Sequence, residues 1–249
     1  MAQLAYNRIT LTYQDPLTCY VYYPKNALNA QGQVLNYYPG VVMLHGGGWA
    51  GGSKADIEAL CIALCRRGTV VMSIDYTLAT EAGMPTLGAT MGNIDNALTL
   101  MRAFGCVAGK PITLAGVSAG GHLANMYTLL AETNLPDKLV TMSAPVDLRL
   151  YDTQLWHHAL LCMLGSTDAD TLEENSPLLM QPNGDVEQLA ILGGQDPFLS
   201  LMSRKEYMTV LGGIPVSGGV LLPGAGHVMD GAIEEWASIV AAWVGCPQP

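Results

Sequence analysis

The apolar positions along the chain follow two periods, one typical of buried strands and one typical of amphipathic helices. Short continuous apolar runs, such as Gly40–Leu44 and Ile112–Val117, predict strands that are covered on both faces. Apolar residues at helical spacing, such as Ile57, Leu60 and Leu64, predict helices that bury one side. Strands therefore alternate with helices along most of the chain.

This pattern predicts a definite order of elements. The predicted strands are Arg8–Tyr13, Cys19–Tyr23, Gly40–Leu44, Val70–Asp75, Ile112–Val117, Leu139–Ser143, Leu189–Leu192 and Gly219–Leu222. The predicted helices are Ala55–Arg67, Gly88–Phe104, Ala119–Glu132, Ser200–Leu211 and Gly231–Val244. The first two strands should form an N-terminal hairpin, and the alternation that follows predicts an α/β fold with a mostly parallel, doubly wound central sheet and helices on both faces. We expect residues 1–249 to form one domain, in which the segment Tyr151–Asp185 is long enough for a small cap.

The composition is that of a compact globular protein, because 50% of the residues are hydrophobic and only 13% are charged. The formal net charge of −10 argues against a nucleic-acid partner, since phosphate binding requires clustered lysine and arginine. The N-terminus lacks a signal-like apolar stretch, and no apolar run is long enough to span a bilayer. We therefore expect a soluble, cytoplasmic protein without a membrane span.

The cysteines are scattered, and none forms the CxxC pair typical of a zinc site. Cys61 and Cys65 share the apolar side of a predicted helix, which favours buried free thiols. The sequence therefore predicts no metal site.

A glycine-rich segment, HGGGWAGGSK, directly follows the predicted strand Gly40–Leu44. A phosphate loop is excluded because it requires Gly-Lys-Ser/Thr, whereas this chain has the order Gly-Ser-Lys. The dinucleotide fingerprint GxGxxG is satisfied by Gly46–Gly51, and Asp75 stands where a ribose-binding acid belongs, so an NAD(P)-binding oxidoreductase stays open. A third interpretation is an oxyanion loop, in which unobstructed backbone N–H groups stabilise a negatively charged oxygen.

An oxyanion loop needs a nucleophile, and the sequence Gly116–Gly121 offers Ser118 between a predicted strand and a predicted helix. A serine on such a turn is strained, and the residues two before and two after it must be small, as Gly116 and Gly120 are. An ordinary glycine-rich turn with a capping serine would leave the same pattern.

Serine attacks efficiently only when a base takes its proton and a carboxylate orients that base. His227 follows the last predicted strand and is the candidate base. Asp196 follows the preceding strand and is the candidate acid, although it could instead be a helix N-cap. Asp147 is the reserve candidate for the acid.

The other downstream histidines fit the role of base less well. His122 lies in the first turns of the helix after Ser118, where we expect it to point away or pack. His157 and His158 fall in the predicted cap, where a solvated or partner-facing pair is expected.

Together HGGGW, GVSAGG, GGQDP and GAGH resemble the α/β-hydrolase superfamily, in particular hormone-sensitive-lipase-like esterases and small feruloyl-esterase and arylformamidase-type enzymes. The resemblance extends from Tyr38 to the end of the chain, and Asp75–Glu81 is similar to the DYRLAPE segment of that group. It implies an α/β-hydrolase fold and a triad of Ser118, Asp196 and His227.

The same resemblance implies an oxyanion hole made of the backbone N–H groups of Gly47, Gly48 and Ala119. Ala119 also suits this role physically, because its N–H opens a helix whose dipole favours an anion. Two departures are Val117, where relatives often have Asp or His, and a short N-terminal region, which predicts an open site.

These residues predict a serine carboxylesterase that hydrolyses small or aryl carboxylic esters through an acyl-enzyme on Ser118. An arylformamidase-type amide hydrolase would use the same triad and stays open. Trp49 and Met229 are candidate substrate-binding residues, with core packing as the alternative for both. No metal or organic cofactor is implied, the expected partner is a small-molecule ester, and a homodimer stays open.

Overall fold

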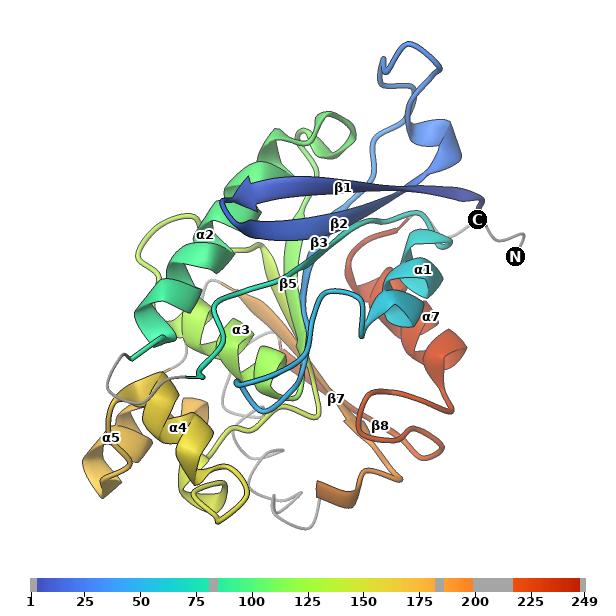
Figure 1. Cartoon of the computed structure of the whole chain (residues 1–249). Coiled ribbons are helices and arrows are strands. Elements are labelled where there is room, and N and C mark those ends of the chain that lie inside the picture. Colours follow the sequence, from blue (N-terminus) through green and yellow to red (C-terminus); the bar gives the residue numbers. More distant parts are fainter. Residues whose placement is uncertain (1–3, 81–84, 182–185, 199–216, 247–249) are drawn as a thin grey trace.

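The computed structural model describes residues 4–80, 85–181, 186–198 and 217–246 of the chain. Eight strands form one sheet in the order β1-β2-β4-β3-β5-β6-β7-β8 (Figure 1). The strands are β1 Tyr6–Gln14, β2 Leu17–Pro24, β3 Gly40–Leu44, β4 Val70–Ile74, β5 Ile112–Val117, β6 Lys138–Met142, β7 Glu187–Gly193 and β8 Ser217–Leu222. The hairpin β1–β2 joins β4 antiparallel, and β3 to β8 all run parallel to one another. The predicted mostly parallel sheet and N-terminal hairpin are confirmed.

Helices cover both faces of the sheet. The α-helices are α1 Glu58–Cys65, α2 Leu87–Ala103, α3 Ala119–Leu130, α4 His157–Leu164, α5 Ala169–Glu174 and α7 Ile233–Trp243, with short 3-10 helices η1 Lys25–Ala27, η2 Gly105–Val107, η3 Leu148–Leu150 and η4 Pro177–Leu179. In Figure 1, α1 and α7 lie on one face, and α2 and α3 lie on the other. No helix in the described ranges is long and apolar enough to cross a bilayer.

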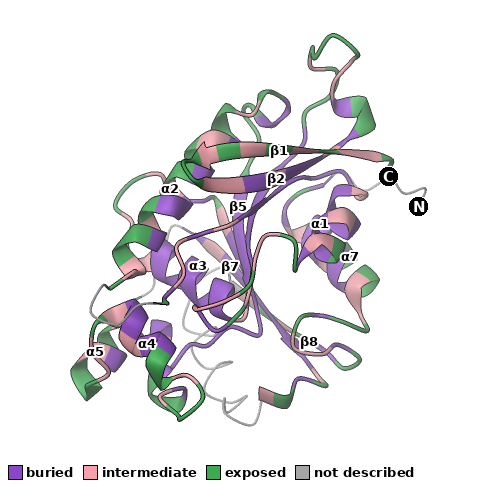
Figure 2. Cartoon of the chain, viewed as in Figure 1, coloured by how far each residue is buried: buried purple, intermediate pink, exposed green. Residues whose placement is uncertain are grey.

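The core consists of two layers, one on each face of the sheet, because successive side chains of a strand point to opposite faces. In β3, Val42 and Leu44 belong to the layer under α2 and α3, whereas Val41 and Met43 belong to the layer under α1 and α7. The central strands are buried throughout, and the edge strand β1 alternates between intermediate and exposed residues (Figure 2). This sandwich fixes the carboxyl ends of the parallel strands, where the predicted functional residues lie.

The segment of residues 151–180, here called the cap segment, holds α4, α5 and η4. Its division from the rest as a small cap, and the treatment of residues 1–249 as one domain, stay predictions. The predicted helix Ser200–Leu211 lies outside the described residues.

Candidate active site

Ser118 occupies a sharp turn between β5 and α3, with φ 54° and ψ −124°. This conformation is strained for any residue with a side chain, and it is held in part by the Ser118 N–H, which donates to the carbonyl of Met142 at 2.8 Å. A methyl group on Gly116 would overlap the carbonyl of Gly120, and one on Gly120 would overlap the carbonyl of His45. Both positions therefore require glycine, and the turn presents Ser118 at the carboxyl edge of the sheet.

His227 and Asp196 are brought together from the loops after β8 and β7. The distance between His227 Nδ1 and Asp196 Oδ2 is 2.8 Å. An ionised carboxylate can only accept a hydrogen bond, so Nδ1 carries the proton and Nε2 keeps its lone pair. The two loops are joined by the Gln195 N–H, which donates to the carbonyl of Ala225 at 2.8 Å.

The Asp196 carboxylate is nearly inaccessible, with a side-chain exposure of 2%. Burial alone would raise its pKa, but His227, the Ser143 hydroxyl and the backbone N–H of Phe198 together lower the pKa below its ordinary value. The Phe198 N–H donates to Asp196 Oδ1 at 2.8 Å, whereas Ser143 Oγ approaches without the geometry of a full hydrogen bond. Asp196 is therefore an anion at neutral pH and is suited to stabilise a protonated His227.

The glycine loop after β3 has an unusual backbone. Gly47, Gly48 and Trp49 have successive φ values of 123°, 57° and 63°. Among the described residues, no carbonyl or side chain accepts from the N–H groups of Gly47 or Gly48. Ala119 is the first residue of α3, where a helix leaves its N–H groups unpaired. Three donors thus stand free beside Ser118.

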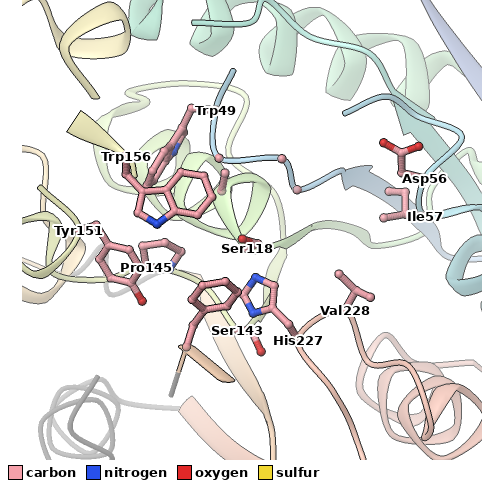
Figure 3. A pocket seen from close by; sticks show the side chains of 15 residues that line it. Trp49, Asp56, Ile57, Ser118, Ser143, Pro145, Tyr151, Trp156, His227 and Val228 are labelled. Atoms are coloured by element: carbon pink, nitrogen blue, oxygen red, sulfur yellow. The ribbon is translucent and has the colours of Figure 1, made fainter. Parts of the chain in front are cut away.

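These groups line a single pocket of about 280 Å³. Its lining residues are Gly46, Gly47, Gly48, Trp49, Asp56, Ile57, Ser118, Ala119, Ser143, Pro145, Tyr151, Trp156, Phe198, His227 and Val228. Figure 3 shows the His227 ring directly below Ser118, at the centre of the pocket. The volume lies at or below the roughly 300–1,000 Å³ typical of drug-sized ligands, which indicates a small substrate.

The pocket has an aromatic half and an aliphatic half. In Figure 3, Trp156 and Tyr151 lie on one side of Ser118, and Ile57 and Val228 lie on the other. The Trp156 ring meets the Trp49 ring edge-on at 6.3 Å and the Phe198 ring at 6.5 Å.

The aromatic half also reaches the base, because the rings of Phe198 and His227 lie 4.8 Å apart. The carboxylate of Asp56, at the other end of the pocket, accepts from the Ser53 N–H at 2.8 Å. The pocket walls are therefore largely apolar, and their polar groups besides Ser118, His227 and the free N–H groups include the side chains of Asp56 and Ser143.

Of the two predicted substrate-binding residues, Trp49 lines the pocket and Met229 does not. Met229 has φ 62°, its N–H donates to the carbonyl of Gly226 at 3.2 Å, and its side chain is fully buried in the core. This tight turn directs Met229 inward and leaves its neighbour Val228 in the pocket. Met229 therefore does not line this pocket, whereas Val228 does.

The remaining candidates have other partners. Asp147, the reserve acid, accepts from Arg149 Nε at 2.9 Å and Nη2 at 2.8 Å, and these hydrogen bonds lower its pKa. His122 is fully buried, whereas His157 is exposed and lies 2.6 Å from Asp152. His158 lies 3.6 Å from Cys162 Sγ.

The geometry does not favour a dinucleotide site. Both Asp75 oxygens bind Lys54, one at its N–H and one at its ammonium, and Thr18 donates to the same carboxylate at 3.2 Å. The helix that follows the glycine loop in the chain, α1, begins only at Glu58, so the loop does not lead directly into a helix N-terminus as the dinucleotide fingerprint requires.

Sequence reasoning missed Tyr151, Trp156, Phe198 and Ser143 as pocket residues. The aromatic residues lie far apart in the sequence and carry no shared motif. One signal was available for Phe198, which closes the QDPF segment that contains Asp196.

Curated relatives match part of the chain, and two of them illustrate the extent of the match. The carboxylic ester hydrolase LipN of Mycobacterium tuberculosis is 35% identical over 99 residues, which are 37% of this chain and 25% of LipN. Kynurenine formamidase of Danio rerio is 28% identical over 106 residues, which are 39% of this chain and 35% of that protein. The chain thus matches well under two thirds of the length of these relatives.

Solved structures resemble the chain over nearly its whole length. Thermogutta terrifontis esterase 2, phosphonylated by sarin, has a TM-score of 0.76 at 19% identity and covers 98% of this chain and 97% of its own. A truncated carbohydrate esterase from gut microbiota has a TM-score of 0.75 at 17% identity, with 98% of both chains covered. At these identities the likeness concerns the fold.

The family described as alpha/beta hydrolase fold matches residues 41–188, more than half of the 249 residues. The match includes the glycine loop and the turn at Ser118, and the strand order agrees with the same fold. The chain belongs to the alpha/beta hydrolase fold family.

Proposed function

We propose that this protein is a serine carboxylesterase that hydrolyses small or aryl carboxylic esters through an acyl-enzyme on Ser118. The observation that carries the proposal is the convergence in one pocket of a strained serine, a histidine bonded to a buried carboxylate at 2.8 Å, and free backbone N–H groups. Acyl transfer to water needs these groups together, and none of them alone would indicate it.

Each group has a defined part in the proposed reaction. Ser118 Oγ attacks the ester carbonyl while His227 Nε2 takes the serine proton, and Asp196 stabilises the imidazolium that forms. The N–H groups of Gly48 and Ala119, with that of Gly47, hold the oxyanion. His227 then protonates the leaving alcohol, and water, activated by His227, releases the acid and restores the serine.

The donors act on the transition state more than on the bound ester, because the negative charge on the oxygen develops only as the bond forms. Each well-placed donor lowers the barrier by about 3 kcal/mol, which corresponds to more than a hundredfold in rate. The apolar walls strengthen these interactions by excluding water.

The pocket walls support an uncharged substrate that carries an aromatic group. Trp156, Tyr151 and Phe198 form one half, and aromatic side chains pair favourably with aromatic ligands. The ratio of kcat/KM for phenyl acetate to that for ethyl acetate tests this proposal. We expect Trp156→Ala to lower this ratio by about threefold to tenfold relative to wild type, in line with the ~0.5–1.5 kcal/mol of an aromatic pair.

Intrinsic differences in ester reactivity cancel, because the same ratio is compared between two proteins. Ile57→Ala, in the aliphatic half, is the matched control and should leave the ratio close to that of wild type. An unchanged ratio in Trp156→Ala would remove the aromatic preference while leaving the esterase proposal intact.

A formamide hydrolase is the second candidate, favoured by the match to kynurenine formamidases. The same triad can open a formyl amide, because a tetrahedral intermediate and a protonated leaving group are required in both reactions. Wild type and Ser118→Ala should be assayed with aryl esters and with N-formylkynurenine. The esterase proposal expects ester hydrolysis that Ser118→Ala abolishes, and faster turnover of the formyl amide would favour the second candidate.

A further inference from the structure

His122 lies on α3, one helical turn after Ser118, and it is fully buried. Its Nδ1 is 3.1 Å from the indole Nε1 of Trp49, and its Nε2 is 3.0 Å from the backbone carbonyl of Asn175. The ring also meets the Trp49 ring edge-on at 5.5 Å. His122 therefore joins three parts of the chain: the nucleophile helix, the glycine loop and the cap segment.

The two partners determine the proton position on His122. A carbonyl oxygen only accepts, so Nε2 must carry hydrogen, and an indole N–H only donates, so Nδ1 must offer its lone pair. One neutral tautomer satisfies both contacts. Burial lowers the pKa of His122 to about 4, so this tautomer persists at neutral pH.

The backbone of Trp49 is strained, and a hydrogen bond to its side chain would help to hold it in place. Its φ of 63° is costly for a bulky side chain, roughly 1–2 kcal/mol, and it directly follows Gly47 and Gly48, which line the pocket. The Trp49 carbonyl accepts from the Ala79 N–H at 2.9 Å, and its indole N–H donates to His122. The indole contact is the only hydrogen bond that the Trp49 side chain makes within the described residues.

We propose that His122 is a positioning residue for the oxyanion loop. By accepting the indole N–H, it holds Trp49 and thereby fixes the left-handed backbone that aims the Gly47 and Gly48 N–H groups at the reacting oxygen. Through Asn175 it couples this loop to the cap segment. The role in catalysis rests on the proposed esterase function, whereas the hydrogen bond itself does not.

Two substitutions of His122 distinguish its hydrogen bond to the Trp49 indole from its hydrogen bond to the Asn175 carbonyl. The Oδ1 of an asparagine stands at the same distance along the side chain as Nδ1, so His122→Asn keeps an acceptor for the indole. His122→Gln places its amide at the level of Nε2 and loses that acceptor. Tyr127→Phe is the matched control, because it removes a hydrogen bond of 2.8 Å to Asp95 from the same helix, away from the pocket.

We expect His122→Gln to lower kcat by about 10- to 100-fold with KM nearly constant, because small displacements of a catalytic group have effects of this size. The affinity for an aryl trifluoromethyl ketone, whose serine adduct carries an oxyanion, should fall by the same factor, whereas the affinity for the product acid should not change. His122→Asn and Tyr127→Phe should stay within a few-fold of wild type. Equal losses in His122→Gln and His122→Asn, or parallel changes in kcat and KM, would overturn the proposal.

A measurement that does not depend on catalytic activity tests this proposal separately from the esterase function. The Trp49 indole N–H resonance, identified by its loss in Trp49→Phe, should exchange with solvent about tenfold faster in His122→Gln than in wild type, in line with one lost hydrogen bond. His122→Asn should retain slow exchange. Unchanged exchange in His122→Gln refutes the positioning role, and a wild type inert to esters and to the ketone refutes only the esterase function.

If the His122 variants fail to fold, Trp49→Phe removes the same bond from the side of the indole. Trp49→Phe must then lower both kcat and the affinity for the ketone. A Trp49→Phe enzyme with wild-type kcat would contradict the proposal.

Discussion

Gly48→Ala is a sharp perturbation of the proposed oxyanion loop. Gly48 has φ 57°, a conformation that costs an alanine roughly 1–2 kcal/mol. A methyl group at this position would also overlap the indole ring of Trp156. The loop can accommodate the methyl only if its backbone turns or the Trp156 ring moves, and either change alters the site.

The expected losses of stability and of kcat in Gly48→Ala follow from these contacts. The backbone strain and the overlap both act on the folded state, so the free energy of unfolding should fall by about 2 kcal/mol or more. If the backbone turns, the Gly48 N–H no longer faces the oxyanion, which removes about 3 kcal/mol of transition-state stabilisation. We therefore expect kcat to fall by roughly 100-fold or more, with a smaller change in KM.

The assay is steady-state hydrolysis of p-nitrophenyl acetate, accompanied by urea unfolding. Gly92→Ala is the matched control, because Gly92 lies exposed inside α2 with nothing within 4 Å of an added methyl. It should keep wild-type kcat and gain up to about 1 kcal/mol of stability. A Gly48→Ala enzyme that keeps wild-type kcat would refute the assignment of the loop.

Further predictions concern the carboxylates and His122. Asp196→Asn should lower kcat by about 10⁴-fold, because an amide can donate to Nδ1 and favour the wrong tautomer of His227. Asp147→Asn should leave kcat close to that of wild type. Equal effects of the two substitutions on kcat at pH 7.5 would contradict the assignment of Asp196 as the acid of the triad. Between about pH 6.5 and pH 4 the unfolded chain protonates its histidine while folded His122 stays neutral, so stability decreases as pH falls. By this linkage, the free energy of unfolding measured in urea should fall by about 3 kcal/mol more for wild type than for His122→Gln between pH 7 and pH 4. If the two proteins showed the same dependence of unfolding free energy on pH, the result would count against a buried neutral His122.

The fold was largely predictable, because binary patterning sets which strands are covered on both faces. The bounds of β3 and β5 agree with the continuous apolar runs Gly40–Leu44 and Ile112–Val117. The predicted helix Ala55–Arg67 is shorter in the structure, where α1 spans Glu58–Cys65. The Asp56 carboxylate accepts from the Ser53 N–H, which stabilises a local turn in place of the first helical turn.

The site was predictable only where local backbone chemistry carries it. The sequence shows a serine flanked by small residues and two loops that directly follow predicted parallel strands. These features place Ser118, Asp196 and His227 at the carboxyl ends of β5, β7 and β8, on one side of the sheet. The aromatic half was not visible, because Trp156 and Phe198 meet only through the tertiary arrangement. The contact between His122 and Trp49 was not visible either, because the two residues belong to different motifs of the sequence.

The most direct test of the proposed mechanism is covalent trapping of the nucleophile. Wild type and Ser118→Ala should be treated with diethyl p-nitrophenyl phosphate, and the adduct should be located by mass spectrometry of the digested protein. We predict release of one equivalent of p-nitrophenol, a single diethylphosphoryl group on Ser118, and neither adduct nor ester hydrolysis in Ser118→Ala. An adduct on another residue of the active wild type, or a Ser118→Ala protein that still hydrolyses esters, would contradict it.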